Sequence, residues 1–415
     1  MSHRCLLWLA VAMSLSACGG SAPPGADASP GIDAQKKIIR IGMLNDESGP
    51  VAAIGRPWAA GKRILLRQVN AGDSGLLPDG WTLEYIERDH GYNPQRSVQL
   101  FNEIRDQVLF IGGSFGTPNT LPLRPLLQRN QIVAFPVSLS SKMAEFEFTP
   151  PVGPSYKNEI KRGLDWAIEQ AGGADPLKLG LIYQQDDYGL DGLEALTEAA
   201  RAKSIPIVSQ QTYSAGQADY TAVVTALKNS GATHVFMTAV PSATGPILGI
   251  AAQLAYKPVW IGNSPSWIDR FFDPKVVPPA MFDNFHLVQS VAFWGEDVPF
   301  MKSFLAAYEK FGRELAPPDT YLLQGYASGL LQLEIVRRMI ESGDWSRAGF
   351  LKALRAFKDY DPQGTLAEAP DYTRLPYMAG TQSRVLKPDF EKKSWKVVSG
   401  YAVPSTSAGG LKASQ

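Results

Sequence analysis

The side chains that carry most catalytic chemistry are few in this chain of 415 residues. Both cysteines fall within the first 18 residues, so the remainder has no thiol to act as a nucleophile or as a thiolate metal ligand. His234 and His286 lie in apolar runs, which favours a structural role. His90 stands beside Asp89 in a polar turn, and a lone Asp-His pair does not make a metal site. We therefore expect no catalytic residue, no metal site and no cofactor.

A glycine-rich segment at residues 112–116, Gly-Gly-Ser-Phe-Gly, could offer a different chemistry. It follows an apolar run, and backbone N–H groups at such a turn can hold an oxygen atom of a ligand. The segment lacks the lysine and the spacing of a phosphate-binding P-loop. Forty basic and forty acidic residues cancel over the whole chain, which leaves no global field to recruit nucleic acid. We expect neither a P-loop nor a nucleic-acid partner.

The first 36 residues have the layout of an export signal followed by a polar linker. Arg4 precedes an apolar run from Leu6 to Leu15, which is shorter than the roughly 20 residues that span a bilayer. We predict a signal peptide over 1–17 and a flexible linker over 18–36, where Gly, Ala, Ser, Pro and Asp dominate. No later apolar stretch is long enough to cross a membrane.

The end of that signal, Leu15-Ser16-Ala17-Cys18, resembles the lipobox of bacterial lipoproteins. The resemblance implies that Cys18 is acylated and becomes the first mature residue, so that the protein is held on a membrane surface. Gly19 after the cysteine implies sorting to the inner leaflet of the outer membrane where a cell has two membranes. An ordinary signal cleaved after Ala17, with an incidental cysteine, is the alternative.

Beyond residue 37, short apolar runs alternate with amphipathic stretches, and the pattern restarts after Pro150-Pro151. Such alternation predicts parallel sheets covered by helices on both faces, here in two separate lobes. The predicted strands cover 38–44, 81–86, 108–111, 132–135, 177–183, 205–208, 234–238, 259–261 and 395–398. The predicted helices cover 57–69, 155–171, 190–202, 244–254, 298–311, 320–340 and 345–357, with two more that carry 98–104 and 220–227.

A series of short signatures then appears in a fixed order. They are Ile41-Gly42, Ser48-Gly49-Pro50, Gly55, Gly61, Arg88-Asp89, Ile111 to Ser114, Ala134-Phe135-Pro136, Asp187-Tyr188-Gly189, Asp219-Tyr220, Gly262 and Tyr321 to Tyr326. Taken together, the series resembles the type I periplasmic binding proteins. More narrowly, it is similar to the branched-chain amino acid (Leu/Ile/Val) branch of ABC-transporter substrate-binding lipoproteins.

The resemblance implies an α/β fold of two doubly wound, Rossmann-like lobes with parallel central sheets, joined by three hinge crossings near 149–155, 288–292 and 362–366. The implied N-terminal lobe comprises 37–152 and 291–362, and the C-terminal lobe 153–290 and 363–404, followed by a disordered tail over 405–415. The ligand of this fold lies between the lobes, beyond the carboxyl ends of the strands.

Three positions depart from the pattern of the amino-acid-binding relatives. Gly116 stands where the main carboxylate-binding serine is expected, although Thr117 and backbone N–H groups could still hold an oxygen. Leu139 replaces a threonine that binds both ends of an amino acid. The acidic partner of the α-ammonium is missing after Gly262, unless the alignment slips and Asp269 or Glu47 takes that role. These changes favour an aromatic or hydrophobic ligand over a plain amino acid.

The residues expected to line the cleft are mostly apolar, aromatic or hydroxyl-bearing: Trp58, Ser114, Phe115, Gly116, Thr117, Val137, Ser138, Leu139, Tyr188, Val240, Ser264, Trp267 and Tyr321, with Phe271 nearby. Alternatively, Trp58, Trp267 and Phe271 only pack the lobes, and Tyr188 only shapes its loop. An aromatic acid, an amide, or a sterol-like or other lipid would suit such a pocket.

The sequence therefore predicts a lipid-anchored, monomeric, non-enzymatic periplasmic solute-binding protein. Its expected partners are a small-molecule ligand, the membrane that holds the anchor, and a membrane permease/ATPase complex. Two alternatives remain: binding of branched-chain amino acids for import, and a role as a sensor or lipid carrier without an importer.

Overall fold

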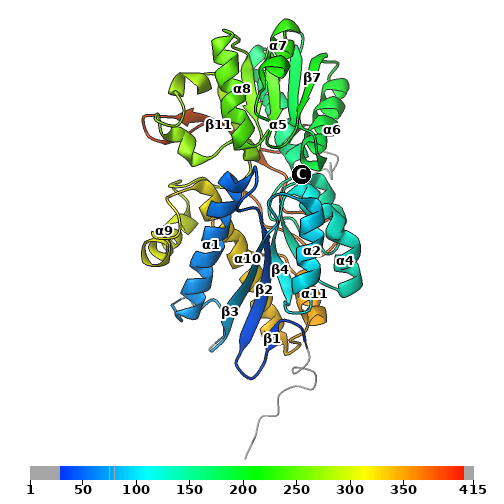
Figure 1. Cartoon of the computed structure of the whole chain (residues 1–415), viewed down its shortest axis with the longest axis vertical. Coiled ribbons are helices and arrows are strands. Elements are labelled where there is room, and N and C mark those ends of the chain that lie inside the picture. Colours follow the sequence, from blue (N-terminus) through cyan, green and yellow to red (C-terminus); the bar gives the residue numbers. More distant parts are fainter. Residues whose placement is uncertain (1–28, 74, 79, 406–415) are drawn as a thin grey trace, which may run out of the picture.

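The computed structural model describes residues 29–73, 75–78 and 80–405. The predicted signal peptide, Cys18, the linker up to residue 28 and residues 406–415 of the predicted tail lie outside the described residues. Figure 1 shows two lobes stacked along the long axis of the molecule, with the chain crossing between them at the waist.

The N-terminal lobe is built on a five-stranded sheet whose four main strands run parallel in the order β3-β2-β4-β5. These strands are β2 (Ile38–Asn45), β3 (Thr82–Asp89), β4 (Phe110–Phe115) and β5 (Ala134–Val137), and the short β1 (Ile32–Asp33) pairs antiparallel with the start of β2. The helices are α1 (Ala52–Asn70), α2 (Pro94–Ile104), α3 (Thr117–Thr120) and α4 (Arg124–Asn130), joined later by α9 (Pro299–Phe311), α10 (Thr320–Ser342) and α11 (Arg347–Arg355). In Figure 1 the late helices lie beside α1 and the early strands, so this lobe is discontinuous in sequence.

The C-terminal lobe holds a seven-stranded sheet in the order β12-β11-β10-β9-β8-β6-β7. Five strands are parallel: β6 (Leu179–Gln184), β7 (Ile207–Tyr213), β8 (His234–Thr238), β9 (Val259–Gly262) and β10 (Phe285–Gln289). Two antiparallel strands, β11 (Ser383–Asp389) and β12 (Ser394–Ala402), complete one edge. The covering helices are α5 (Tyr156–Ala171), α6 (Asp187–Ala202), α7 (Thr221–Asn229) and α8 (Pro241–Gln253).

Several helices that start at the waist are fixed by side-chain caps. Asn93 accepts a hydrogen bond from the Arg96 N–H, and Pro94 occupies the first turn of α2, where its missing N–H costs nothing. The Asp186 carboxylate accepts from the Tyr188 and Gly189 N–H groups at the start of α6. Each cap fixes where its helix begins and therefore which residues follow the preceding strand into the cleft.

Three segments cross between the lobes. The first leads from β5 to α5, the second from β10 to α9, and the third from α11 to β11. The second and third lie side by side, because Val291 and Leu366 form an antiparallel bridge and the Ala292 N–H donates to the Thr365 carbonyl at 3.0 Å. The predicted architecture of two α/β lobes with mainly parallel sheets and three crossings is confirmed.

Two local features differ from expectation. The segment predicted as linker ends in β1, where Ile32 is buried and pairs with Ile39. Gly31 allows this close approach, since a Cβ there would lie 1.9 Å from the Leu109 backbone nitrogen. The strand β11 was not predicted, because its outer half (Lys-Pro-Asp) lacks the apolar run that marks a buried strand.

Candidate functional site

A pocket lies between the lobes, where the carboxyl ends of both parallel sheets and all three crossings meet. It encloses about 1050 Å³ of space between atoms, including the part that opens to solvent. Its lining residues are Val51, Ile54, Trp58, Tyr92, Phe115, Gly116, Thr117, Val137, Ser138, Leu139, Val152, Tyr156, Tyr188, Val240, Ser264, Pro265, Val291, Tyr321, Leu323, Gln324, Ala327, Ser328, Leu331, Tyr360, Thr365 and Leu366.

Two helices of the N-terminal lobe supply one wall. Trp58 reaches the pocket from α1, and Tyr321 reaches it from the first turn of α10. The helices pack closely because Gly61 and Gly325 have no side chains: a Cβ on either would lie 2.0 Å from a backbone oxygen of the other helix. This tight packing fixes the position of the Trp58 ring against the cavity.

The turn after β4 supplies a second wall, and its geometry excludes a serine at its centre. Gly116 has φ 88°, a left-handed conformation that favours glycine. A Cβ there would lie 2.7 Å from the Asn119 Nδ2 and 2.8 Å from the Tyr92 Cε2. The neighbouring Thr117 hydroxyl instead shares a 2.7 Å hydrogen bond with the Ser138 hydroxyl. The carboxylate-binding serine that the resemblance would place at 116 therefore has no room here.

Tyrosines from both lobes surround the cavity and are tied to protein acceptors. The Tyr188 hydroxyl donates to the Asn263 Oδ1 at 2.8 Å, and the Tyr321 hydroxyl donates to the Ser264 carbonyl at 2.7 Å. The Tyr188 and Tyr156 rings meet edge to face, with centroids 5.1 Å apart. The tyrosine rings thus face the pocket as apolar surface, while the hydroxyls of Tyr188 and Tyr321 are hydrogen-bonded to the protein.

The lining contains no Asp, Glu, Lys, Arg or His among the described residues. The nearest carboxylates stand one layer behind it. Glu159 accepts hydrogen bonds from the Ser264 N–H at 3.0 Å and from the Ser264 and Ser290 hydroxyls. Burial raises the pKa of Glu159 to about 7, while these hydrogen bonds lower it. Burial also raises the pKa of Asp186 above its usual range.

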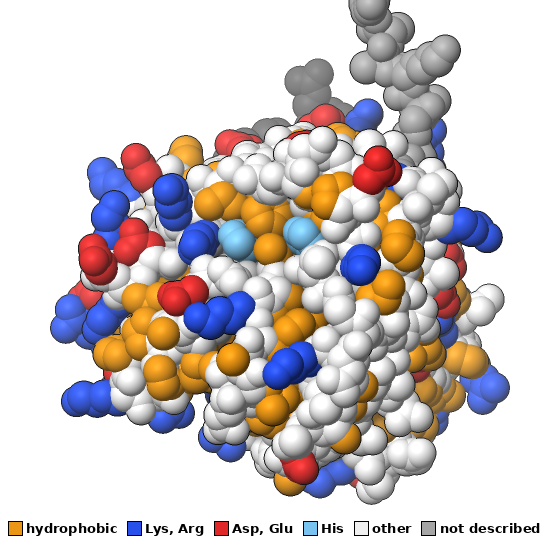
Figure 2. Space-filling view, turned by 90° about the horizontal axis from the view of Figure 1, so that it is seen from above, with side chains coloured by type: hydrophobic (Ala, Val, Ile, Leu, Met, Phe, Trp, Pro, Cys, Tyr) orange, Lys and Arg blue, Asp and Glu red, His pale blue; other side chains and the backbone are white. Residues whose placement is uncertain are grey.

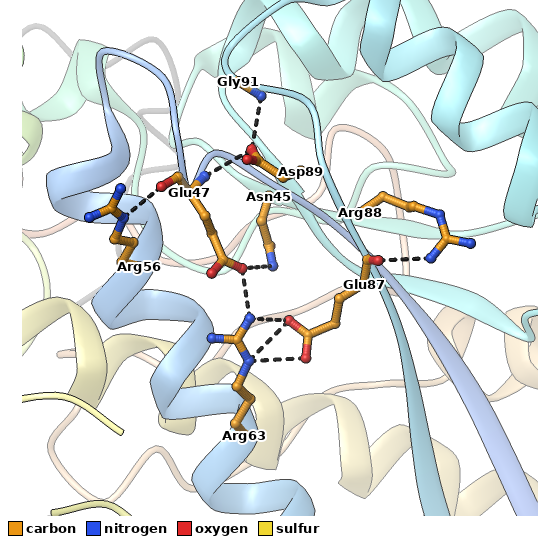
Figure 3. Close-up of polar contacts among 8 residues, drawn as sticks. All are labelled: Asn45, Glu47, Arg56, Arg63, Glu87, Arg88, Asp89 and Gly91. Atoms are coloured by element: carbon orange, nitrogen blue, oxygen red, sulfur yellow. Dashed lines mark hydrogen bonds and ion pairs between the residues drawn. The ribbon is translucent and has the colours of Figure 1, made fainter. Parts of the chain in front are cut away.

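Neither of the two carboxylates considered as an ammonium partner reaches the pocket. Asp269 is half-buried and accepts hydrogen bonds from the Thr320 N–H and hydroxyl, both at 2.7 Å, and from the Trp267 indole N–H at 3.2 Å. Glu47 is not among the lining residues and takes part in the polar contacts drawn in Figure 3. There it pairs with Arg63 at 2.7 Å, and Arg63 also pairs with Glu87 at 2.5 Å. We call these three residues the charged cluster.

Hydrogen bonds between the lobes close the cleft over the pocket. The Tyr92 hydroxyl, from the N-terminal lobe, donates to the Asp186 carboxylate of α6 at 3.2 Å. Near the start of the first crossing, the Ser141 hydroxyl and N–H both donate to Asp191. With the bond from Tyr321 to the Ser264 carbonyl, these contacts hold the two sheet edges against each other. The structure is a closed form of a two-lobed binding fold.

Eleven of the thirteen residues predicted for the cleft line this pocket, and Ser114 and Trp267 do not. The Ser114 hydroxyl is buried and lies 2.8 Å from the Thr120 hydroxyl, inside the turn. Trp267 packs into an aromatic cluster of the C-terminal lobe, 4.6 Å from the Trp395 ring and 5.4 Å from the Phe271 ring. For Trp267 and Phe271, the structure matches the alternative in which they only pack the lobe.

Several lining residues were not identified from the sequence, although helical spacing could have found some of them. Val51 and Ile54 precede Trp58 on one face of α1, and Gln324, Ser328 and Leu331 follow Tyr321 on one face of α10. Others lie on the predicted crossings: Val152, Val291, Thr365 and Leu366. Tyr92 and Tyr360 carry no pattern that marks them.

The histidines in the described part of the chain are not among the residues that line the pocket. His234 begins β8 and His286 is the second residue of β10, both near the amino ends of their strands and far along the sheet from the cleft. Figure 2 looks onto the molecule from above the C-terminal lobe and shows histidine side chains among hydrophobic ones, with acidic and basic side chains around them. No group of three or more His, Cys, Asp or Glu in the described part of the chain could hold a metal ion. No helix there is long and apolar enough to cross a membrane.

The comparison with protein families is decisive for the fold. The family model described as periplasmic binding protein matches residues 38–374. The chain belongs to the periplasmic binding protein family. Its two lobes and parallel sheets identify it as a type I member.

Relatives of this periplasmic binding protein are distant. A Leu/Ile/Val-binding protein homolog 8 from Brucella abortus (strain 2308) is 24% identical over 236 residues, covering 54% of this chain and 57% of the relative. This match thus spans little more than half of the relative's length. A fatty acid ABC transporter substrate-binding protein from Thermomonospora curvata has a TM-score of 0.83 at 22% identity, covering 92% and 96% of the two chains. A branched-chain amino acid ABC transporter protein from Thermus thermophilus with bound valine has a TM-score of 0.78 at 19% identity, covering 89% and 97%. At these identities the structures establish the fold of this periplasmic binding protein and not its ligand.

Proposed function

We propose that this protein captures a small ligand between its lobes and delivers it to a membrane transporter of the ABC class. The observation that carries the proposal is the closed pocket at the meeting point of two parallel sheets, lined from both lobes and from all three crossings. A site that both lobes complete can couple ligand binding to closure, because the ligand favours the closed form by its extra contacts there. A carrier needs this coupling, because its transporter can then distinguish the closed, ligand-bound form from the empty form. In this role the protein performs no catalysis.

We propose that the ligand is aromatic or otherwise hydrophobic. Trp58, Phe115, Leu139 and Val240 supply apolar surface, and the tyrosine rings add more. Amino-acid-binding relatives hold the α-carboxylate and the α-ammonium at positions that differ here. Gly116 has no room for a serine side chain, and Leu139 has no hydroxyl. No acidic side chain is found among the described lining residues. Buried polar groups without partners are costly, so this wall suits an apolar molecule better than an amino acid.

A second function, import of branched-chain amino acids, is favoured by the similarity to the Leu/Ile/Val-binding homologue and to the valine-bound structure. The two proposals differ in what the pocket must satisfy. Leucine brings two charges into the cavity, whereas an aromatic or lipid-like ligand brings none or one.

We also propose a periplasmic location, consistent with the family, with the protein anchored through acylated Cys18 and acting as a monomer. The supporting evidence is the order of residues 15–18 and the apolar run before them. Mass spectrometry of the protein purified from detergent-solubilised membranes tests the anchor: a diacylglyceryl adduct that is lost in Cys18→Ser supports it, and an unmodified Cys18 in the mature chain contradicts it.

A thermal-shift panel tests the ligand class. The purified protein is titrated with leucine, benzoate, benzamide, decanol and cholesterol dispersed in cyclodextrin. A ligand present at 100 times its dissociation constant adds about 2.7 kcal/mol to stability and raises the melting temperature by several degrees. We expect the largest rise from an aromatic or lipid-like compound. The largest rise from leucine would support amino-acid import instead.

A further inference from the structure

We infer that the ligand of the interlobe pocket is electrically neutral: an apolar or aromatic molecule with one or two weakly polar atoms, and neither a carboxylate nor an amino-acid zwitterion. This inference rests on the proposed binding function and narrows its ligand class. It is drawn from the charges and the hydrogen-bond donors that the closed pocket offers.

The first observation is the absence of charge from the wall. None of the 26 described lining residues is Asp, Glu, Lys, Arg or His. A carboxylate enclosed there would lose its hydration and gain no opposite charge. It would then depend on neutral donors to satisfy its two oxygens, which together accept about four hydrogen bonds.

The second observation is that the protein already uses most of those neutral donors. The tyrosine and serine hydroxyls on the wall donate inward to other protein groups: Tyr92 to Asp186, Tyr188 to Asn263, Tyr321 to the Ser264 carbonyl, Ser264 to Glu159, Ser328 to the Gly325 carbonyl and Thr365 to the Pro362 carbonyl. Turning any of them toward a ligand would break a hydrogen bond within the protein, which offsets part of what the new bond gains.

The donors that remain are few and come from separate elements. Among the described residues they are one hydroxyl of the Thr117–Ser138 pair, the Tyr156 hydroxyl on α5, the Gln324 amide on α10 and the Tyr360 hydroxyl beyond α11, with the first N–H groups of the short α3. Such a set suits a single carbonyl, amide or hydroxyl oxygen.

The pKa values of ionisable groups behind the pocket wall are also shifted toward the uncharged forms. Behind the wall, burial raises the pKa of Glu159 to about 7 and raises that of Asp186, and burial lowers the pKa of Lys62 to about 7. Lys62 lies against the Trp58 ring, 5.6 Å from its centroid, and donates to the Gln332 amide. Burial thus moves the pKa of each of these groups in the direction that favours its uncharged form.

Isothermal titration calorimetry with matched pairs of probes tests the inference. The pairs are benzamide with benzoate and decan-1-ol with decanoate, each titrated into the purified full-length mature protein at pH 7.5, with leucine as the zwitterion. We expect the neutral member of at least one pair to bind at least about tenfold more tightly than its anion. Equal or tighter binding of the anions, or tightest binding of leucine, would overturn the inference while leaving the binding function intact. Failure of all five probes would overturn the proposed apolar ligand class and this inference with it.

A charge-insertion variant provides the second arm. Leu139 lines the pocket beside the first crossing, so Leu139→Arg introduces a guanidinium, and Leu139→Met serves as the neutral control of similar volume. We expect Leu139→Arg to reverse the preference within a pair, so that the anion binds more tightly than the neutral probe, while Leu139→Met keeps the order of the wild type. An unchanged order in a folded Leu139→Arg variant would show that these probes bind elsewhere and would overturn the inference.

Discussion

The helix α1 separates two regions of opposite character, the wall of the pocket and the charged cluster of Glu47, Arg63 and Glu87. On one face, Trp58 lies against the cavity and α10, with 4% of its surface exposed. On the other, Arg63 pairs with Glu47, which follows β2, and with Glu87, which lies within β3, as Figure 3 shows. Both regions lie near the carboxyl ends of the strands of the N-terminal sheet. The described wall of the pocket has no charged side chain, whereas each side chain of the charged cluster forms an ion pair.

The difference explains how this fold can keep a ligand site free of charge. The carboxyl ends of parallel strands attract polar side chains, because N–H groups of the following turns are unpaired there. Here those polar groups are bound to one another. The Asp89 carboxylate accepts from the Glu47 and Gly91 N–H groups, and the Arg56 guanidinium donates to the Glu47 carbonyl. The pocket wall next to them is then left to aromatic and aliphatic side chains.

Removing the wall residue of α1 gives the largest expected effect. Trp58→Ala deletes a buried ring that packs between two helices, and large-to-small changes of this kind cost about 3–5 kcal/mol of unfolding free energy. We also expect weaker ligand binding. Urea denaturation measures the first effect, and the control is Arg56→Ala on the opposite, exposed face of α1, which should cost less than about 1 kcal/mol. Equal losses in both variants would contradict the contrast between the faces.

The buried carboxyl behind the wall predicts a pH dependence. Because the pKa of Glu159 is raised in the folded protein to about 7, the folded state holds its proton more tightly than the unfolded state. Its contribution to stability is therefore full below the unfolded pKa of about 4.5 and is lost as the pH rises through 7. We expect the wild type to lose on the order of 2 kcal/mol more than Glu159→Gln between pH 5 and pH 8. Parallel pH profiles of the two proteins would show that Glu159 is ionised in the fold.

A smaller change distinguishes the role of the Tyr188 ring from that of its hydroxyl. Tyr188→Phe keeps the apolar surface and leaves the Asn263 Oδ1 without its 2.8 Å donor. We expect a loss of about 1 kcal/mol in stability, because the Asn263 Oδ1 keeps only the 3.4 Å hydrogen bond from the Ser266 hydroxyl, and ligand affinity within about threefold of the wild type. A tenfold loss of affinity in this variant would mean that the hydroxyl binds the ligand directly.

The smallest effect is expected in the charged cluster. Arg63→Met removes two ion pairs whose side chains are each 27–31% exposed. Partly exposed ion pairs are screened by solvent, so we expect the unfolding free energy to fall by about 1 kcal/mol, and by less at high salt. We expect the ligand affinity to stay unchanged. Titration of the best probe into the variant measures the second point, and a changed affinity would show that the cluster is coupled to the pocket.

The order of strands and helices was predictable because apolar runs and amphipathic periods set it locally. The helix at Pro94 begins where the Asn-Pro cap predicts. Phe115 and Leu139 reach the pocket because Phe115 ends the parallel strand β4 and Leu139 follows the parallel strand β5. Trp267 shows where this reasoning fails. It also follows a parallel strand, yet rings from η4 (Asp269–Phe272) and β12 surround it, and only the tertiary fold brings those rings together.

The hydrogen-bond partners of the polar groups in the site could not be predicted from the sequence either. Nothing in the sequence shows that the hydroxyls of Tyr188 and Tyr321 are already bound to the protein, since their acceptors are 75 and 57 residues away. The same holds for Asp269, whose carboxylate is used by the start of α10. Which polar groups remain for a ligand depends on such long-range pairings, and a sequence pattern does not report them.

The central claim is that the cavity between α1, α10 and the three crossings is where the ligand binds. Ala327 lines this cavity from α10, and Ala327→Trp would fill it, whereas Ala222→Trp places the same ring on the exposed surface of α7. Calorimetric titration of the tightest-binding probe into both variants tests the claim directly. We predict at least a hundredfold loss of affinity for Ala327→Trp alone, equivalent to about 2.8 kcal/mol. Undiminished binding by a folded Ala327→Trp protein would contradict the account.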